Sequence, residues 1–261
     1  MLFTEDKLLI HFSTDQICTY ILKDDTLTLL RTESATFVDT TVTEAMIDQI
    51  GQFFAALSND VGEINNERVR LYATGIFQEL TQDEQIELIN QVFVNHGLYF
   101  NVIAPDLEQF YLEISTSYNG SHNVMEGIVH QEFRKVVVCG SFQQYLDDIG
   151  EVMSVLEKRN ITVLSPWTTK IVPETIGTDF ILLEGQEPLK NERDPWTHKY
   201  IHMKKFRQSD AIIICNPDGT VGKGTMFEFG YMVAHAKRII FTERPTALSI
   251  PFPYEIGLNF K

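Results

Sequence analysis

The sequence predicts an α/β protein with two domains, and three observations support this. The 261 residues exceed the length of one average domain. Hydrophobic residues make up 44% of the chain, with 18 Phe and 9 Tyr among them, so proper cores can be filled. From residue 135 onward, apolar strands alternate with helices, which is the pattern of a parallel sheet. We therefore expect one domain over residues 1–125 and a second over residues 133–261.

The first half of the chain predicts a mixture of strands and helices. Residues 7–31 contain two strand-like runs, and Lys23-Asp24-Asp25 supplies a turn, so a hairpin or meander opens the protein. Apolar residues at helical spacing predict a first helix over 43–57. The polar segment 117–123 is the candidate linker. The other predicted elements are strands over 69–74 and 99–103 and helices over 82–96 and 106–116.

The second half predicts a doubly wound parallel sheet of the Rossmann or flavodoxin type. Its first apolar strand ends in Gly140-Ser141-Phe142 and leads into a helix, which together form a parallel crossover unit. In such a sheet ligands bind beyond the carboxyl ends of the strands, so the loops after Cys139, Leu164 and Cys215 are candidates. The predicted strands are 135–139, 161–164, 211–215 and 238–242, the helices are 144–159, 196–208 and 225–236, and 168–193 is irregular.

Charge and composition restrict the partners. Thirty-six acidic against 21 basic residues give a net charge of −15, which repels nucleic-acid backbones and anionic lipid. A small phosphorylated ligand stays compatible, because backbone amides bind phosphate locally. The N-terminal residues resemble no signal peptide, and no run reaches membrane-spanning length, so we expect a cytoplasmic protein without a membrane partner. Three widely spaced cysteines, Cys18, Cys139 and Cys215, predict buried free thiols.

The stretch 209–240 carries the most chemical information. A loop beginning at Asn216 contains Gly219, Gly222 and Gly224, and these glycines let backbone approach a ligand closely. The next helix points its free amides back at this loop, which suits an anionic or polar ligand. Glycine-rich loops of this kind also occur without a ligand, and that alternative stays open.

Glu228 has two interpretations. Thr225 and Glu228 have the spacing of a capping box, in which Thr225 caps the helix and Glu228 reaches back to it. Alternatively, a carboxylate one turn into this helix faces the carboxyl edge of the sheet and acts as a nucleophile on a sugar's anomeric carbon. The sequence leaves this choice open.

Residues 222–231, Gly-Lys-Gly-Thr-Met-Phe-Glu-Phe-Gly-Tyr, preceded by Ser-Asp-Ala-Ile-Ile-Ile, resemble the nucleoside 2-deoxyribosyltransferase superfamily. The resemblance spans residues 135–242 and includes Val-Val-Val-Cys-Gly-Ser-Phe. It implies that Glu228 is the nucleophile of a double displacement at an N-glycosidic bond, with Asp210 or Asp218 protonating the leaving base. Gly222 stands where many of these transferases have a second aspartate, which puts base transfer in doubt.

Other residues near the strand ends are candidate ligand contacts. Gly140, Ser141 and Phe142 form the first loop, and the resemblance implies that Ser141 binds a 5′-phosphate. Trp167 stacks on a base or simply packs. The basic residues of 202–207 form a solvated face or offer a cation to phosphate. No His, Cys or Asp cluster has metal-ligand spacing, so neither a metal nor a cofactor is expected. The ligand-binding set is Gly140, Ser141, Phe142, Trp167, Asn216, Gly222, Gly224 and Thr225.

Residues 69–111 resemble the first domain of the exopolyphosphatase family, which has an actin-like fold. The pieces that match are the strand 69–74, the helix ending at His96, and Val102-Ile103 followed by Glu108. The family's glycine-serine phosphate loop corresponds here to residues 11–15, His-Phe-Ser-Thr-Asp, which lack the family's glycine. The resemblance therefore implies an actin-like half domain used for dimerisation or regulation.

Two functions follow from these observations. The first is an enzyme that cleaves or exchanges the N-glycosidic bond of a nucleoside or nucleotide through Glu228. The second is a module that binds a nucleotide in the same pocket without turning it over. In both, the partner is a small-molecule nucleoside or nucleotide, and a homo-oligomer is expected.

Overall fold

A computed structural model describes residues 7–24, 26–191, 193–246, 248 and 252–257, and it confirms the α/β class. The chain divides into two compact units. Unit 1 comprises residues 1–132 and 251–255, and unit 2 comprises residues 133–250 and 256–261. Among the described residues, no helix is both long enough and apolar enough to cross a membrane.

Unit 1 contains a five-stranded sheet with the order β3-β2-β1-β4-β5. The central strand β1 pairs antiparallel with β2 and parallel with β4, with Leu8 opposite Val69. The strands are β1 Lys7–Phe12, β2 Gln16–Lys23, β3 Thr26–Ser34, β4 Val69–Ala73 and β5 Phe100–Val102. The helices are α1 Glu44–Val61, η1 Gly75–Glu79, α2 Gln82–His96, α3 Pro105–Asn119 and α4 Val124–His130.

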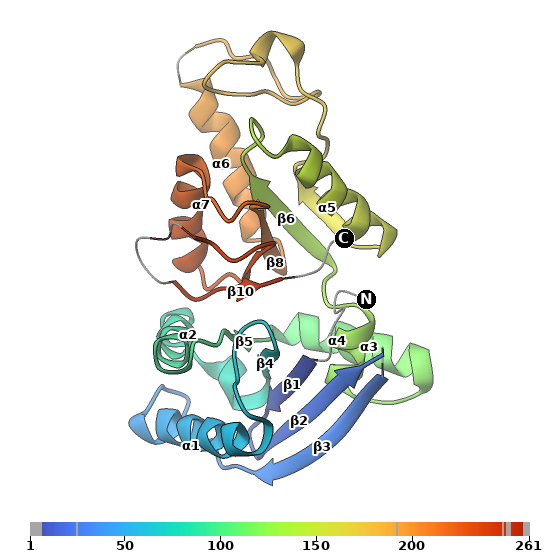
Figure 1. Ribbon diagram of the computed structural model, residues 1–261, viewed down its shortest axis with the longest axis vertical. Coiled ribbons are helices and arrows are strands. Elements are labelled where there is room, and N and C mark those ends of the chain that lie inside the picture. Colours follow the sequence, from blue (N-terminus) through green and yellow to red (C-terminus); the bar gives the residue numbers. More distant parts are fainter. Residues whose placement is uncertain (1–6, 25, 192, 247, 249–251, 258–261) are drawn as a thin grey trace. The chain divides into compact units, whose positions relative to one another are not determined.

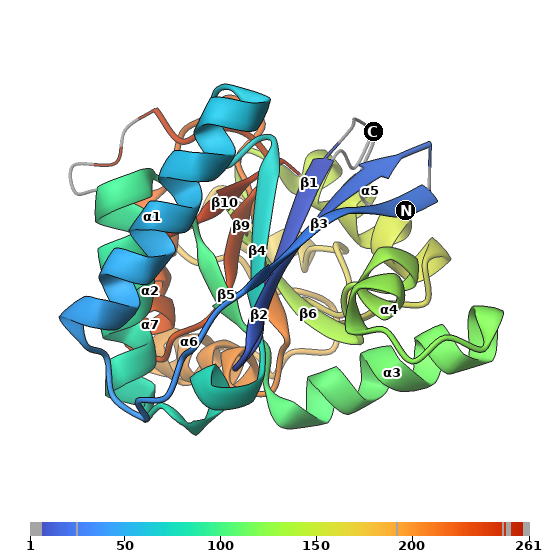
Figure 2. The same ribbon diagram turned by 90° about the horizontal axis from the view of Figure 1, so that it is seen from below.

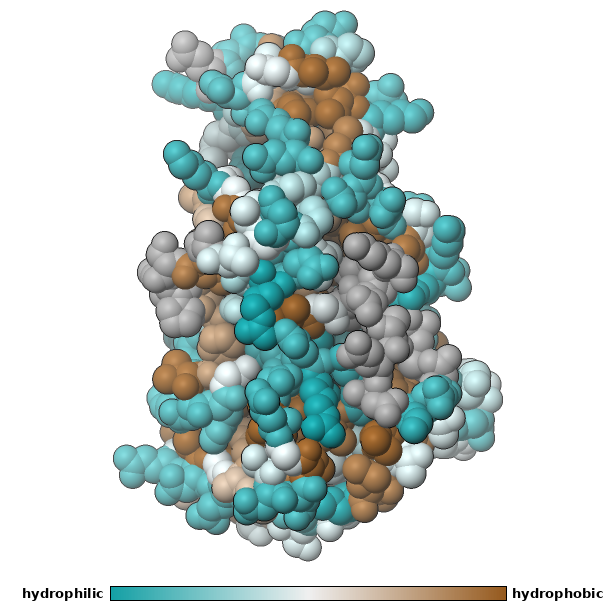
Figure 3. Space-filling view, viewed as in Figure 1, coloured by the Kyte–Doolittle hydropathy of each residue, from teal (hydrophilic) through white to brown (hydrophobic). Residues whose placement is uncertain are grey.

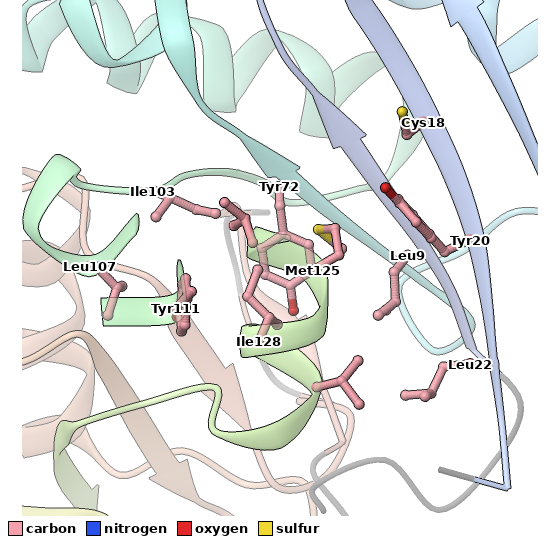
Figure 4. Close-up of a cluster of buried hydrophobic side chains, with 12 residues drawn as sticks. Leu9, Cys18, Tyr20, Leu22, Tyr72, Ile103, Leu107, Tyr111, Met125 and Ile128 are labelled. Carbon is pink, nitrogen blue, oxygen red and sulfur yellow. The ribbon is translucent and has the colours of Figure 1, made fainter. Parts of the chain in front are cut away.

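Alternation along β1 places a separate core on each face of this sheet. Phe12 points to the α1 side, where its ring contacts the rings of Phe37, Phe53, Phe54, Phe77 and Phe100 at centroid distances of 5.0–6.5 Å. Leu9 and Tyr72 face the opposite side and pack with Met125 and Ile128 of α4 (Figure 4). Accordingly, α1 and α2 lie on one side of the sheet and α3 and α4 on the other (Figure 2).

The segment 117–123, predicted as a linker, comprises the end of α3 and the short turn that leads into α4. A Cβ on Gly127 would lie 2.0 Å from the Tyr111 carbonyl oxygen, so only glycine allows this approach. Unit 1 extends to residue 132 and unit 2 begins at residue 133, because α4 packs into the core of unit 1. The opening segment forms three strands rather than two, with an extra turn at residues 13–15. Asp25 of the predicted turn lies outside the described residues.

His11 makes the stability of unit 1 depend on pH. Burial lowers the pKa of His11 from 6.5 to about 4, and its Nε2 lies 2.9 Å from Thr74 Oγ1. The unfolded chain therefore binds more protons between these pH values, and stability is lost as the pH falls from 6.5 towards 4. We expect a loss of up to about 3 kcal/mol, measured by denaturant unfolding across this range. The same slope in His11→Asn would contradict this assignment.

Unit 2 is built on a second sheet with the order β10-β9-β8-β6-β7. Strand β6 pairs parallel with both β7 and β8, and β8 pairs parallel with β9. The strands are β6 Lys135–Gly140, β7 Thr162–Ser165, β8 Ala211–Cys215, β9 Ile239–Phe241 and β10 Glu255–Ile256. The helices are α5 Leu146–Lys158, η2 Pro173–Thr175, α6 Asp194–Phe206 and α7 Lys223–Val233.

The chain reverses its direction across this sheet after β7, because β8 lies on the other side of β6. Parallel crossovers are right-handed, so α5 covers one face while α6 and α7 cover the other. Figure 1 shows α5 on one side of β6 and α6 and α7 on the other. The carboxyl ends of β6 and β7 and the side chains of α6 therefore line the same cavity.

All three cysteines are buried and free, as expected.

Candidate functional site

A cavity of about 390 Å³ lies at the carboxyl ends of β6 and β7. Cys139 and Gly140 end β6, Ser165 ends β7, and side chains of α6 and α7 complete the wall. The segment between β7 and α6 closes the remaining side with Trp167 and Phe180. Apolar atoms gather at the surface over this segment, where Ile176 is exposed (Figure 3). The cavity is thus formed entirely by unit 2.

Glu228 lies at the cavity wall and does not cap its helix. Helix α7 begins at Lys223 with Gly222 as the N-cap and no side-chain capping bond, so Thr225 lies inside the helix. The Glu228 side chain is 5% exposed, and its Oε1 lies 2.5 Å from Lys199 Nζ and 3.3 Å from His202 Nε2. The capping-box interpretation is therefore wrong, because the helix starts two residues before the predicted cap.

The electrostatics of this contact keep Glu228 ionised. Burial by itself acts to raise the pKa of Glu228, since it disfavours a charged carboxylate. The hydrogen bond and charge of His202, together with the charge of Lys199, outweigh burial and hold the pKa below its ordinary value of 4.5. Glu228 is therefore an anion at neutral pH, with a cation and an imidazole directly beside it.

His202 links Glu228 to both strands beneath it. Its Nδ1 lies 2.6 Å from Ser165 Oγ, and its Nε2 lies 3.5 Å from Cys139 Sγ. An edge contact with the Phe206 ring, at a centroid distance of 5.0 Å, further fixes the imidazole. Burial and then the charge of Glu228 raise the pKa of Cys139 well above its ordinary value, so Cys139 is a thiol rather than a nucleophilic thiolate.

No sequence pattern joins these residues. The sequence predicts that His202 belongs to a solvated basic face or offers a cation to phosphate, whereas in the fold its ring nitrogens contact side chains of β6 and β7. Lys199 and His202 are three residues apart and therefore share one face of α6. This three-residue spacing was the signal that the sequence offered. The residues that Lys199 and His202 contact lie on other elements, and spacing along the chain does not identify them.

The predicted ligand residues divide into two groups. Gly140, Phe142 and Trp167 line the cavity together with Glu228. A Cβ on Gly140 would meet the Cys215 carbonyl oxygen at 2.9 Å, so glycine is needed where β6 approaches β8. The other predicted residues, Ser141, Asn216, Gly222, Gly224 and Thr225, are not among those that line the cavity.

Asn216 and Thr225 are held within the protein. The Asn216 side chain donates to the Glu243 carbonyl oxygen at 3.0 Å and accepts from the Glu243 amide at 3.1 Å. Thr225 is buried in the first turns of α7. Asn216 therefore joins the loop after β8 to the end of β9 and has a structural role.

The two predicted general acids lie away from Glu228. Asp210 precedes β8, at the amino ends of the strands, where it pairs with Arg134 Nη2 at 3.0 Å and accepts the Lys135 amide at 3.1 Å. Asp218 accepts hydrogen bonds from Tyr145 and Thr220, which lower its pKa. Neither residue lines the cavity, and Asp218 is ionised at neutral pH, so it holds no proton to donate.

In unit 1, a hydrogen bond from its own backbone already engages the segment 11–15, which corresponds to the family's phosphate loop but lacks its glycine. Thr14 Oγ1 accepts the Ile76 amide at 3.1 Å and joins the loop after β1 to the loop after β4. A Cβ on Gly75 would come within 2.4 Å of the same hydroxyl oxygen. The backbone amide of Ile76 is therefore already satisfied by this contact.

A scan against protein-family models and a search of curated proteins both return no match. Solved structures do resemble the chain. A Ppx/GppA family member of Aquifex aeolicus has a TM-score of 0.33 and 13% identity, covering 81% of this chain and 66% of its own. An exopolyphosphatase of Cytophaga hutchinsonii has a TM-score of 0.34 and 11% identity, covering 82% and 68%. The chain thus spans about two thirds of the length of these structures.

These comparisons correct the functional prediction. They support the exopolyphosphatase resemblance, and none of the results supports the resemblance to nucleoside 2-deoxyribosyltransferases. The prediction of N-glycosidic bond cleavage or base exchange is therefore wrong, and the transferase and glycosidase classes are withdrawn with it. A likeness at these TM-scores says nothing about the activity of this chain, so function is argued from the cavity itself.

Proposed function

We propose that unit 2 binds a small anionic molecule with a planar ring, of the nucleotide class, in the cavity beside Glu228. One observation carries the proposal. The full chain has 36 acidic residues against 21 lysines and arginines and 7 histidines, whereas the cavity is lined by two lysines and two histidines against only two carboxylates. The basic side chains are His198, Lys199, His202 and Lys205, and the carboxylates are Glu187 and Glu228.

Lys205 supplies the charge for the anionic group. Lys199 is already neutralised by Glu228 at 2.5 Å, whereas no carboxylate among the described residues pairs with the Lys205 ammonium. An unpaired, partly buried ammonium at a cavity wall attracts phosphate strongly, because the apolar surroundings weaken screening by solvent. The phosphate therefore binds on the Lys205 side of the cavity.

Trp167 supplies the surface for the ring. Its indole is 53% exposed and lines the cavity, while its Nε1 donates to the Glu184 carbonyl oxygen at 3.0 Å. This hydrogen bond holds an otherwise mobile aromatic face in one orientation, which lowers the entropic cost of stacking. The floor carboxylate Glu228 accepts hydrogen bonds from ligand hydroxyl groups.

The place of the cavity agrees with this proposal. We assign unit 2 to the doubly wound sheets, in which ligands bind outside the carboxyl ends of the strands where the strand order reverses. Here the strand order reverses between β6 and β8, and β6 contributes Cys139 and Gly140 to the cavity. Unit 1 remains a non-catalytic module in this proposal, and the homo-oligomer remains a prediction.

Tryptophan fluorescence tests the proposal directly. The chain has two tryptophans, so Trp196→Phe leaves Trp167 as the only indole reporter. We expect nucleoside monophosphates and diphosphates to quench Trp167 in a saturable way, and the unphosphorylated nucleosides to bind at least tenfold more weakly. Lys205→Ala in this background removes one charge-assisted contact of about 1.5 kcal/mol and weakens nucleotide binding about tenfold.

Lys204→Ala is the matched control, because the Lys204 ammonium lies over the Tyr200 ring at 4.7 Å and does not line the cavity. It is expected to leave affinity within a factor of two. Inorganic phosphate and polyphosphate complete the panel, with phosphate release followed in parallel. Equal weakening by both lysine variants, or no saturable quenching by any nucleotide, would refute the proposal.

A further inference from the structure

We propose that Cys139, His202 and Glu228 form a binding site for a divalent transition metal ion with tetrahedral preference, best matched by zinc. No pair of these residues has metal-ligand spacing in the sequence, and the fold alone brings them together. Their ligand atoms all lie within 4.8 Å of one another. The site shares Glu228 with the proposed ligand but is separate from the ligand's contacts with Trp167 and Lys205.

The two distances from the His202 imidazole to its neighbours match edges of a zinc tetrahedron. Zinc bonds of about 2.3 Å to sulfur and about 2.0–2.1 Å to nitrogen or oxygen place tetrahedral S and N about 3.6 Å apart, and N and O about 3.3 Å apart. Cys139 Sγ and His202 Nε2 lie 3.5 Å apart, and His202 Nε2 and Glu228 Oε1 lie 3.3 Å apart. His202 Nε2 is therefore at the distance from Cys139 Sγ and from Glu228 Oε1 that two ligands of one zinc ion have.

Ser165 gives His202 the support that metal-binding histidines use. A ligating histidine donates its second N–H to an acceptor, which fixes the tautomer and the ring. Ser165 Oγ lies 2.6 Å from His202 Nδ1 and can accept this proton while Nε2 binds the metal. The same hydroxyl donates to Nδ1 when the proton is on Nε2, so the contact serves both states.

The Lys199 ammonium is the cation that now lies beside Cys139, His202 and Glu228. Its ammonium contacts Glu228 at 2.5 Å, and its side chain is 28% exposed, so it has a path outwards to solvent. A metal ion replaces the ammonium as the counter-charge of Glu228, and the lysine leaves. Removing the ammonium is therefore expected to strengthen metal binding.

All three ligands line the cavity, so the fourth tetrahedral position opens onto it. Three protein ligands with one open position are typical of zinc sites that bind water or an exogenous group. The three protein ligands therefore leave one coordination position of the metal free, and this position faces the same cavity as the proposed nucleotide-class molecule.

Cobalt(II) spectroscopy of the full-length, chelator-treated and reduced protein tests the site. We expect one equivalent of Co²⁺ to give the intense visible bands of tetrahedral cobalt and a near-ultraviolet sulfur-to-cobalt band, both abolished by added Zn²⁺. Cys139→Ala is expected to lose the sulfur band. Cys215→Ala, a matched buried thiol on the neighbouring strand β8, retains it. Ser165→Ala is expected to weaken binding about tenfold or more, and Lys199→Met to strengthen it about tenfold.

His202→Gln gives an independent check if Cys139→Ala fails to fold by circular dichroism, and it too is expected to abolish the tetrahedral spectrum. A sulfur band that survives in folded Cys139→Ala, or wild-type protein that shows only weak octahedral cobalt absorption, would overturn the proposal. The nucleotide titration is run with chelator present, so its failure and the failure of metal binding are distinguishable.

Discussion

Lys199→Met is expected to lower the free energy of unfolding of unit 2 by about 3 kcal/mol at neutral pH and to weaken its loss of stability at acid pH. Methionine keeps the aliphatic packing of the lysine stem but removes the ammonium that lies 2.5 Å from Glu228. The carboxylate, with 5% of its side chain exposed, cannot recover this interaction from water. Loss of the partner therefore leaves a buried anion supported by His202 alone.

The direction of the pH effect follows from Glu228. In the wild type, its pKa lies below 4.5, so its contribution is present above that pH and is lost as the pH falls through the lower folded value. In Lys199→Met, one of the two partners that oppose burial is lost, so the pKa of Glu228 rises from its wild-type value. The folded and unfolded states then differ less in bound protons, and less stability is lost as the pH falls. Denaturant unfolding from pH 4 to 8 measures both slopes.

Two variants make this experiment specific. Lys170→Met removes an exposed ion pair with Glu184, at 3.8 Å and with 75% and 60% of the side chains exposed, and is expected to change stability by under about 0.5 kcal/mol. Glu228→Gln added to Lys199→Met removes the buried charge and is expected to flatten the profile. An unchanged profile in Lys199→Met would show that Glu228 does not depend on the ammonium.

Phe12→Ala is expected to lower the free energy of unfolding of unit 1 by about 3–5 kcal/mol. Phe12 is fully buried at the end of β1 and contacts five other phenylalanine rings, so alanine leaves a cavity that no single neighbour can fill. Hydrogen exchange read by mass spectrometry locates the effect. Amides of β1 and β4 are expected to exchange faster, whereas those of β6 and β8 keep their protection.

Phe227→Ala is the matched control, because the same side chain is removed from a site that is 53% exposed. Surface truncations of this kind change stability by about 0.5 kcal/mol. If Phe12→Ala accelerated exchange in β6 and β8 as strongly as in β1 and β4, the two units would not be independent cores.

Strong local patterns predicted most of unit 2 correctly. The strand 211–215 was predicted with its observed bounds, since a continuous apolar run bounded by polar loops is typical of a strand buried on both faces. In unit 1 the short turn at residues 13–15 was missed because apolar residues flank it on both sides, so β1 and β2 were predicted as a single strand and the opening as two strands rather than three. Helix α7 begins two residues earlier than predicted, which was enough to misassign the role of Thr225.

By itself, the sequence determined the α/β class, the parallel strands of unit 2 and the position of Glu228 in a helix after a glycine-containing loop, because these depend on apolar periodicity and on a local loop-helix motif. Only the tertiary structure decided what Glu228 contacts. Cys139, Ser165 and His202 come from three different elements, and their meeting depends on strand order and on the face that α6 presents. The tertiary structure likewise placed Asp210 at the amino ends of the strands, away from the cavity, where it pairs with Arg134. Contacts between residues distant in sequence depend on how the elements pack, which spacing along one chain does not reveal.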